Sequence, residues 1–184
     1  EIEGVSRKGY KLISSPDIII PDEVLQGLNT KFIGREIKHF QEIDSTNNFA
    51  KTLDGSAPDG TVIVAEKQTG GKGRLGRVWS SLKGGLYFTL FLSPKIDPIK
   101  ASKLTQVAAA ALVKVFRDMN INAEIKWPND IYLNGKKLTG ILTEMKCEID
   151  CINYILIGIG INVNIDSSGF NDEVYVFAVF IYFS

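Results

Sequence analysis

Histidine and cysteine are scarce in this chain of 184 residues, which contains one histidine, His39, and two cysteines, Cys147 and Cys151. A structural zinc site takes four such ligands, so these three side chains cannot form one. A catalytic triad would have to use His39, which lies in an apolar-flanked run, and we expect an ordinary strand residue there. We expect the cysteines to flank a turn as reduced thiols rather than to form a disulfide.

The chain also lacks an excess of charge of either sign. Lysine and arginine together number 21, and aspartate and glutamate together also number 21. This balance excludes a general positive coat for nucleic acids, although local basic clusters remain open. Hydrophobic residues make up 45% and charged residues 23%, which is typical of a globular domain and excludes a disordered chain.

Long apolar runs are missing as well. The run from Val174 to Phe183 carries no charge, but it is shorter than the roughly 20 residues that a membrane-spanning helix needs. It predicts a fully buried strand or, if it is uncovered, an aggregation-prone segment. We expect no membrane partner and a cytoplasmic protein. Because the chain begins at Glu1 without a methionine or a signal sequence, we also expect a fragment or a processed chain.

Strands outnumber helices in the predicted order of elements. Helices are expected at residues 23–28, from a cap at residues 44–47 to about Leu53, and at residues 101–119. Strands are expected at residues 37–43, 61–65, 86–92, 123–126, 131–133, 138–145 and 152–159. Asn134-Gly135 between two of these strands is typical of a type I′ hairpin turn. The order predicts an α+β fold with a mixed β-sheet flanked by helices.

The most informative stretch is a glycine-rich loop, residues 70–79. A dinucleotide-binding loop with the pattern G-x-G-x-x-G opens a helix, whereas this loop leads into a strand. A protein kinase would also need the H-R-D and D-F-G motifs, which the chain lacks. What remains is a loop of four glycines that carries Lys72, Arg74 and Arg77 and suits closure over an anionic ligand. A solvated basic turn is the simpler alternative.

Five motifs, in this order, resemble those of biotin–protein ligases. They are Ser45-Thr46-Asn47, Gly71-Lys72-Gly73-Arg74-Leu75-Gly76-Arg77-Val78-Trp79, Lys126-Trp127-Pro128-Asn129-Asp130, Lys136-Lys137-Leu138-Thr139-Gly140-Ile141-Leu142 and Gly158-Ile159-Gly160-Ile161-Asn162. The resemblance covers roughly residues 21–164 and implies the class II synthetase-like catalytic domain of a biotin–[acetyl-CoA-carboxylase] ligase. It divides the chain into a remnant of a winged-helix wing or linker (1–15), the catalytic domain (16–170) and an apolar tail (171–184).

The resemblance implies a two-step reaction. Biotin and Mg-ATP give biotinyl-5′-adenylate and pyrophosphate, and the biotinyl group then passes to a lysine of a biotin carboxyl carrier protein. ATP, Mg²⁺ and biotin are the implied ligands, with the Mg²⁺ carried by ATP rather than by a cage of protein side chains. Such a site needs cations at the phosphate, an apolar slot for biotin and a lid against water.

The same resemblance implies the residues of the site. Lys137 and Arg74 are expected to be catalytic, Lys137 at the carboxylate and phosphate oxygens and Arg74 as a clamp on the adenylate. The residues expected to bind biotin are Ser45, Thr46, Asn47, Gln68, Gly71, Lys72, Gly73, Arg74, Lys137 and Gly140. Those expected to bind the adenylate are Arg74, Arg77, Trp79, Asp130, Lys137 and Asn162. The simpler readings are a surface lysine at Lys137, a helix cap at residues 45–47 and a core aromatic at Trp79.

The sequence departs from the family pattern in two places. The family usually has arginine where Lys72 stands, and lysine keeps the charge but loses the bidentate fork. The family also continues past Asn164 into a small β-barrel, and nothing after Phe170 resembles that barrel. The resemblance therefore implies a catalytic domain that is truncated at both ends.

Two other functions remain open. A lipoate or octanoate ligase of related fold would need a longer tunnel. A biotin-responsive transcriptional repressor belongs to another class, and balanced charge with only a wing remnant predicts poor DNA binding by this chain. A homodimer through the central sheet also remains open.

Overall fold

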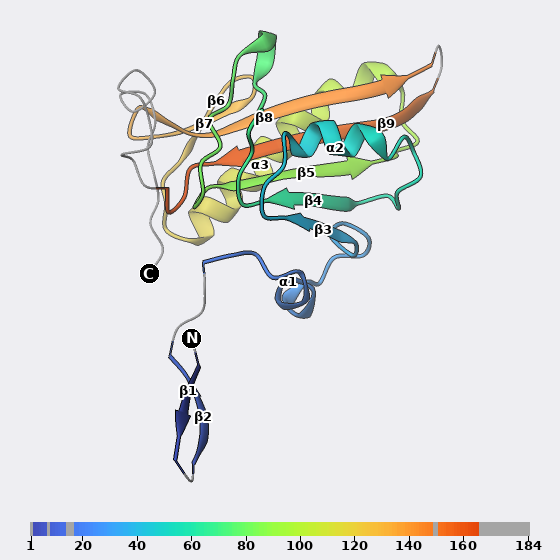
Figure 1. The fold of residues 1–184 in the computed structure, drawn as a ribbon. Coiled ribbons are helices and arrows are strands. Elements are labelled where there is room, and N and C mark those ends of the chain that lie inside the picture. Colours follow the sequence, from blue (N-terminus) through green and yellow to red (C-terminus); the bar gives the residue numbers. More distant parts are fainter. Residues whose placement is uncertain (1, 7, 14–16, 149–150, 166–184) are drawn as a thin grey trace.

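The computed structural model describes residues 2–6, 8–13, 17–148 and 151–165 of the chain. Figure 1 shows one large sheet with helices on both faces and a separate small hairpin near the N-terminus. The hairpin pairs β1 (Ile2–Val5) with β2 (Gly9–Leu12) in antiparallel fashion. Its assignment to a winged-helix wing stays a prediction. The strand predicted at Val174 to Phe183 lies outside the described residues.

The large sheet has seven strands in the order β3-β4-β5-β9-β8-β7-β6. Its β3–β4 pair is parallel and the other pairs are antiparallel, so the predicted mixed sheet is confirmed. The strands are β3 (Ile37–Phe40), β4 (Thr61–Ala65), β5 (Leu86–Leu92), β6 (Glu124–Lys126), β7 (Asp130–Leu133), β8 (Lys136–Cys147) and β9 (Ile152–Ile161).

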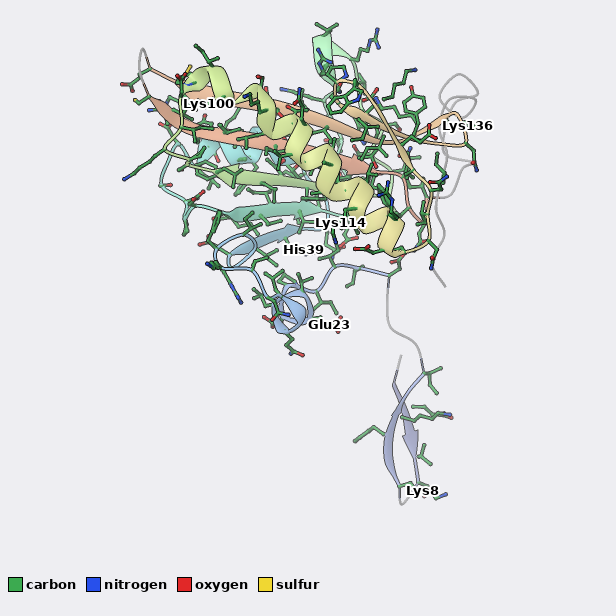
Figure 2. The ribbon with its side chains drawn as sticks, turned by 180° about the vertical axis from the view of Figure 1, so that it is seen from behind. Lys8, Glu23, His39, Lys100, Lys114 and Lys136 are labelled. Carbon is green, nitrogen blue, oxygen red and sulfur yellow. The ribbon has the colours of Figure 1, made fainter. Side chains whose placement is uncertain are left out.

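Helices cover the two faces of this sheet separately. The helix α2 (Thr46–Thr52) packs on one face against β4, β5 and β9, and α3 (Ser102–Asp118) packs on the other, as Figures 1 and 2 show from opposite sides. The helix α1 (Pro21–Gly27) lies beside β3 at the edge. Two short 3₁₀ helices, η1 (Arg74–Gly76) and η2 (Pro98–Lys100), complete the elements.

Two apolar cores result from this layering. The core under α3 contains Phe116, Ile131 and Leu138, and the core under α2 contains Phe91 and Leu156. Since β9 is covered by a helix on each face, it is buried along most of its length, and its sequence is largely apolar. Two glycines on its α2 face, Gly158 and Gly160, lie at the functional site described below.

Most predicted elements are confirmed within a few residues. The main difference is β3, which was expected to reach residue 43 but ends at Phe40, because the exposed polar residues Gln41 and Glu42 leave the sheet. Ile43 returns to form an isolated bridge with Gln68. Asn134 and Gly135 both have positive φ, of 51° and 76°, as a type I′ turn requires.

The scarce residues take the roles that the sequence predicts. His39 lies in β3, where its Nε2 atom is 2.7 Å from Oε1 of Glu66. Cys147 and Cys151 are exposed free thiols at the β8–β9 connection, within the part of the chain that the structure describes. Among the described residues, no helix combines the length and the apolar character needed to cross a membrane.

Candidate functional site

Glycines form the floor of the candidate site, on the α2 face of the sheet. Gly140 in β8 pairs with Gly160 in β9, and the indole ring of Trp79 lies against both. A Cβ atom at Gly140 would come within 2.8 Å of this ring, and one at Gly160 would overlap its Nε1 atom. Gly158 makes room for the Asn47 side chain in the same way. The missing Cβ atoms therefore let side chains reach the backbone of the sheet.

The N-terminal end of α2 forms one wall. Ser45 is the N-cap residue, and its hydroxyl accepts a hydrogen bond from the Asn48 backbone N–H at 3.4 Å. Ser45, Thr46 and Asn47 are only 2–4% exposed. The helix-cap reading of these residues is thus confirmed. It is compatible with a place in the pocket, because their side chains also face the glycine floor.

A chain of hydrogen bonds runs beneath this wall. The Thr46 backbone N–H donates to Oε1 of Gln68 at 2.8 Å, and Nε2 of Gln68 donates to the Ser81 hydroxyl at 2.8 Å. The Thr89 hydroxyl, fully buried on β5, donates to Oδ1 of Asn47 at 2.5 Å and lies 2.8 Å from the Thr46 hydroxyl. The polar side chains of the wall are therefore held in fixed orientations.

The chain continues to a carboxylate on β8. Nδ2 of Asn47 donates to Oε2 of Glu144 at 2.8 Å, and Nζ of Lys51 forms an ion pair with Oε1 at 2.7 Å. Burial alone would raise the pKa of Glu144. The hydrogen bonds from Lys51 and Asn47, together with the charges of Lys51 and Lys72, outweigh burial and hold this pKa below its ordinary value. Glu144 is therefore ionised at neutral pH.

The glycine-rich loop forms a small hairpin over the floor. The Trp79 N–H donates to the Gly71 carbonyl at 2.9 Å, and the Gly73 N–H donates to the Arg77 carbonyl at 2.7 Å. The 3₁₀ turn η1 lies at its tip, in the green segment at the top of Figure 1. Gly71 is buried against the Trp79 carbonyl and the Ser81 hydroxyl, so the loop begins from a fixed base.

Two side chains tie this loop to opposite walls of the site. Nζ of Lys72 donates to Oδ1 of Asn48 on α2 at 2.7 Å. Nη1 of Arg74 donates to Oδ1 of Asn129, in the β6–β7 connection, at 2.7 Å. The loop therefore lies closed across the site, with positive charge at both attachments.

Lys137 projects over the floor from the start of β8. Its Nζ atom is 2.7 Å from Oδ1 of Asp130 and 5.3 Å from the centre of the Trp79 ring. The Lys137 side chain is 30% exposed. The ion pair holds the ammonium at the mouth of the site, where a carboxylate or phosphate oxygen of a ligand can reach it.

The pocket enclosed by these elements has a volume of about 50 Å³. Sites for small molecules usually measure about 300–1,000 Å³, so the Trp79 ring and the loop must shift for such a ligand to enter. In this position Nε1 of Trp79 is buried without a hydrogen-bond partner among the described residues. The pocket is lined by Ser45, Thr46, Asn47, Gln68, Lys72, Gly73, Arg74, Trp79, Asn129, Lys137, Gly140, Ile141, Leu142, Gly158, Ile159 and Gly160.

The structure thus brings together most residues that the sequence singles out. Four predicted residues lie beside this pocket, outside its lining as given by the described residues. Gly71 forms the base of the loop, and Asp130 pairs with Lys137. Arg77 lines a second cavity under the loop, together with Glu144. Asn162 is buried, and its Nδ2 atom donates to the Lys137 carbonyl at 3.3 Å.

Sequence reasoning missed three polar residues that support the site. Asn129 stands inside a recognised motif, but the motif gave no sign that it meets Arg74. Thr89 reads as one polar residue in an apolar strand, and Glu144 as one acid near a strand end. Their roles come from strand register, since Thr89 lies opposite Gly158 and Glu144 opposite Leu156.

Several known proteins are similar in sequence to this chain. A family model described as the biotin/lipoate A/B protein ligase family matches residues 39–162. The bifunctional ligase/repressor BirA of Bacillus spizizenii is 46% identical over 177 residues, which cover 95% of this chain and 54% of that protein. The protein of the same name from Escherichia coli is 34% identical over 161 residues, covering 86% and 49%. The chain therefore spans about half the length of these relatives.

A solved structure gives the same result for the fold. The biotin protein ligase from Aquifex aeolicus, in complex with biotin and ATP, superposes with a TM-score of 0.62 at 34% identity. The match covers 79% of this chain and 59% of that chain. The predicted mixed sheet with flanking helices is thus the fold of a biotin ligase catalytic domain.

Proposed function

Since the chain belongs to the biotin/lipoate A/B protein ligase family, we propose that it is an ATP-dependent biotin–protein ligase of the cytoplasm. One observation carries the proposal: Lys137, Arg74 and Lys72 surround a floor of glycines at the end of a buried polar wall. Cations suit the phosphate and carboxylate groups of the reaction, and the polar wall suits the ureido ring of biotin. Because the chain spans about half of its relatives, the activity of this chain is itself part of the proposal.

In the first step, an oxygen of the biotin carboxylate attacks the α-phosphorus of Mg-ATP. A bond forms between this oxygen and phosphorus, the bond to the β,γ-phosphate breaks, and pyrophosphate leaves with the bonding electrons. Lys137 neutralises the charge that builds up between the two anions, and Asp130 holds its ammonium in place. Arg74 and Lys72 close the loop over the adenylate and keep water from it.

In the second step, a lysine amine of a biotin carboxyl carrier protein attacks the acyl carbon of the adenylate. A carbon–nitrogen bond forms, AMP leaves with the electrons of the broken carbon–oxygen bond, and the amine loses a proton. The loop must open on one side for the carrier lysine to enter. The carrier is the proposed partner, and Mg²⁺ enters with ATP.

The polar wall favours biotin over lipoate or octanoate as the acid. Thr46, Asn47 and Gln68 present fixed donors and acceptors to the pocket. A ureido ring matches such groups, whereas a dithiolane or an alkyl chain leaves them unpaired after burial. A site built for hydrogen bonding rejects an analogue that lacks the partner groups by much more than an apolar pocket rejects a small change in size.

The direct test is biotin-dependent exchange between pyrophosphate and Mg-ATP, with lipoate and octanoate as matched acids. We expect exchange with biotin and none with the other two acids. Exchange with lipoate or octanoate but not with biotin would contradict the proposed substrate and identify that acid as the substrate. A folded chain that shows no exchange with any acid would contradict the proposed activity.

Entry of biotin is expected to move the Trp79 ring from the glycine floor. The pocket of about 50 Å³ is too small for a bicyclic acid while the ring lies against Gly140 and Gly160. We expect the tryptophan emission of the Trp127→Phe variant, in which Trp79 is the remaining tryptophan, to change when biotin is added. The Trp79→Phe variant, which reports on the exposed Trp127, is the matched control. A change confined to Trp127 would contradict movement of Trp79.

A further inference from the structure

Glu144 lies beside the pocket and lines the second cavity under the loop. It projects from β8 and accepts a hydrogen bond from Nδ2 of Asn47, whose amide lies against Gly158. Asn47 is 4% exposed and Thr89 is fully buried. The described lining of the pocket includes Asn47 but neither Thr89 nor Glu144. These two residues can therefore affect a ligand through the orientation of Asn47.

An ionised carboxylate can only accept hydrogen bonds, and this property fixes the direction of the chain. Because Glu144 accepts, Asn47 must turn its Nδ2 group toward Glu144 and its Oδ1 toward Thr89. The Thr89 hydroxyl must then donate its one hydrogen to Oδ1 of Asn47. Toward the Thr46 hydroxyl, 2.8 Å away, the Thr89 hydroxyl can then only accept. The Thr46 hydroxyl also lies 3.1 Å from Oε1 of Gln68, so its orientation depends on both neighbours.

The other end of the chain is fixed independently. The Thr46 backbone N–H can only donate, so Oε1 of Gln68 faces it and Nε2 of Gln68 faces Ser81. The Ser81 hydroxyl in turn donates to the Trp79 carbonyl at 3.1 Å. Asn47 and Gln68, the two amides of the wall, thus owe their orientation to different anchors, and the anchor of Asn47 is Glu144.

We propose that Glu144 is a positioning residue for biotin: by fixing the orientation of the Asn47 amide, it determines whether Asn47 presents a hydrogen-bond donor or an acceptor at each point of the pocket. The inference rests on the proposed function, because it names biotin as the ligand. A glutamine at this position has the same size but can both donate and accept. The Asn47 amide could then rotate by half a turn and present its donor where the acceptor stood.

The ion pair between Glu144 and Lys51 suggests a different explanation, in which Glu144 only stabilises the fold. The two roles are separable. Lys51→Met removes the ion pair but leaves a carboxylate that can only accept from Asn47. Glu144→Gln removes the ion pair and replaces that carboxylate with an amide that can either donate or accept. Glu42→Gln is the matched control for charge, since Glu42 also pairs with a lysine, Lys67, at 2.7 Å.

The test is calorimetric titration of each variant with biotin, beside thermal unfolding and the KM for ATP at saturating biotin. A rotated Asn47 amide would lose its hydrogen bond to biotin, so we expect Glu144→Gln to weaken biotin binding by about 10-fold to 100-fold. The KM for ATP should stay within about twofold of the wild-type value. We expect Lys51→Met and Glu42→Gln to bind biotin within about twofold of wild type, with Lys51→Met losing as much thermal stability as Glu144→Gln.

A second pair of variants tests the inference if Glu144→Gln does not fold. Thr89→Val removes the hydroxyl that donates to Asn47 and keeps the side-chain volume. Thr89→Ser keeps the hydroxyl and removes only the methyl group. We expect weaker biotin binding in the valine variant and near wild-type binding in the serine variant. Equal binding by the two would overturn the inference.

The outcomes also separate this inference from the proposed function. Two results would overturn the positioning role and leave the ligase proposal intact. One is that Glu144→Gln binds biotin as tightly as the wild type, and the other is that Lys51→Met weakens biotin binding as much as Glu144→Gln does. Wild-type protein that is folded but binds no biotin would contradict the ligase proposal, and this inference with it.

Discussion

Replacing Lys137 with alanine is expected to slow formation of the adenylate by about 10²–10³-fold, the scale for losing one charged contact in a transition state. The Nζ atom of Lys137 lies at the mouth of the pocket, held 2.7 Å from Asp130. In the proposed first step a carboxylate approaches a phosphate, and negative charge accumulates there. Without the ammonium, the charge of Asp130 would also remain unpaired beside the site and oppose both anions.

Pyrophosphate exchange measures this effect directly, at saturating biotin and Mg-ATP. The neighbouring Lys136 is the matched control, because it carries the same charge on the same strand but is exposed beside the hairpin turn, as labelled in Figure 2. We expect Lys136→Ala to exchange at close to the wild-type rate. Near-normal exchange by Lys137→Ala would show that another residue supplies the positive charge.

Replacing Arg74 with glycine is expected to release the adenylate rather than to abolish its formation. Arg74 joins the loop to Asn129 on the far wall, and in the proposed reaction we expect its guanidinium to close the lid over the acyl-phosphate group. Loss of one charge-assisted bond, about 1.5–3 kcal/mol, predicts release of the adenylate that is roughly 10-fold to 100-fold faster. The freed mixed anhydride would then biotinylate lysines on any protein nearby.

Biotin blotting after incubation with a mixture of a carrier domain and an unrelated protein measures this release. Because glycine also loosens the backbone of the loop, Arg74→Ala separates loss of the guanidinium from gain of flexibility. We expect labelling of both proteins by both variants and labelling of the carrier alone by the wild type. Labelling confined to the carrier lysine in Arg74→Gly would count against Arg74 as a clamp.

Local sequence patterns determined the secondary structure and much of the site. The apolar spacing in α3, the Ser45 cap of α2 and the Asn134-Gly135 turn each depend on residues a few positions apart. Such patterns act through local backbone preferences, so they can be recognised in the sequence without knowledge of the tertiary contacts. The family resemblance added the expected roles of Lys137 and Arg74, and the structure places both at one pocket.

Contacts between distant segments could not be read in this way. The position of the Trp79 ring depends on Gly140 and Gly160 lying opposite each other on neighbouring strands, which follows from the register of β8 and β9. The small volume of the resulting pocket, about 50 Å³, could not be predicted from the residues of the loop alone. The closed loop also depends on Asn48 and Asn129, which lie on separate walls.

The sequence by itself determined that this chain forms a mixed sheet with flanking helices and carries the motifs of a biotin ligase. Element types and motifs both depend on residues that are close together in the sequence. Only the tertiary structure decided that Glu144, 97 positions from Asn47, accepts a hydrogen bond from it. That contact requires β8 and α2 to pack on the same face of the sheet. Burial and strand register, which belong to the whole fold, therefore set the orientation of the polar groups in the pocket.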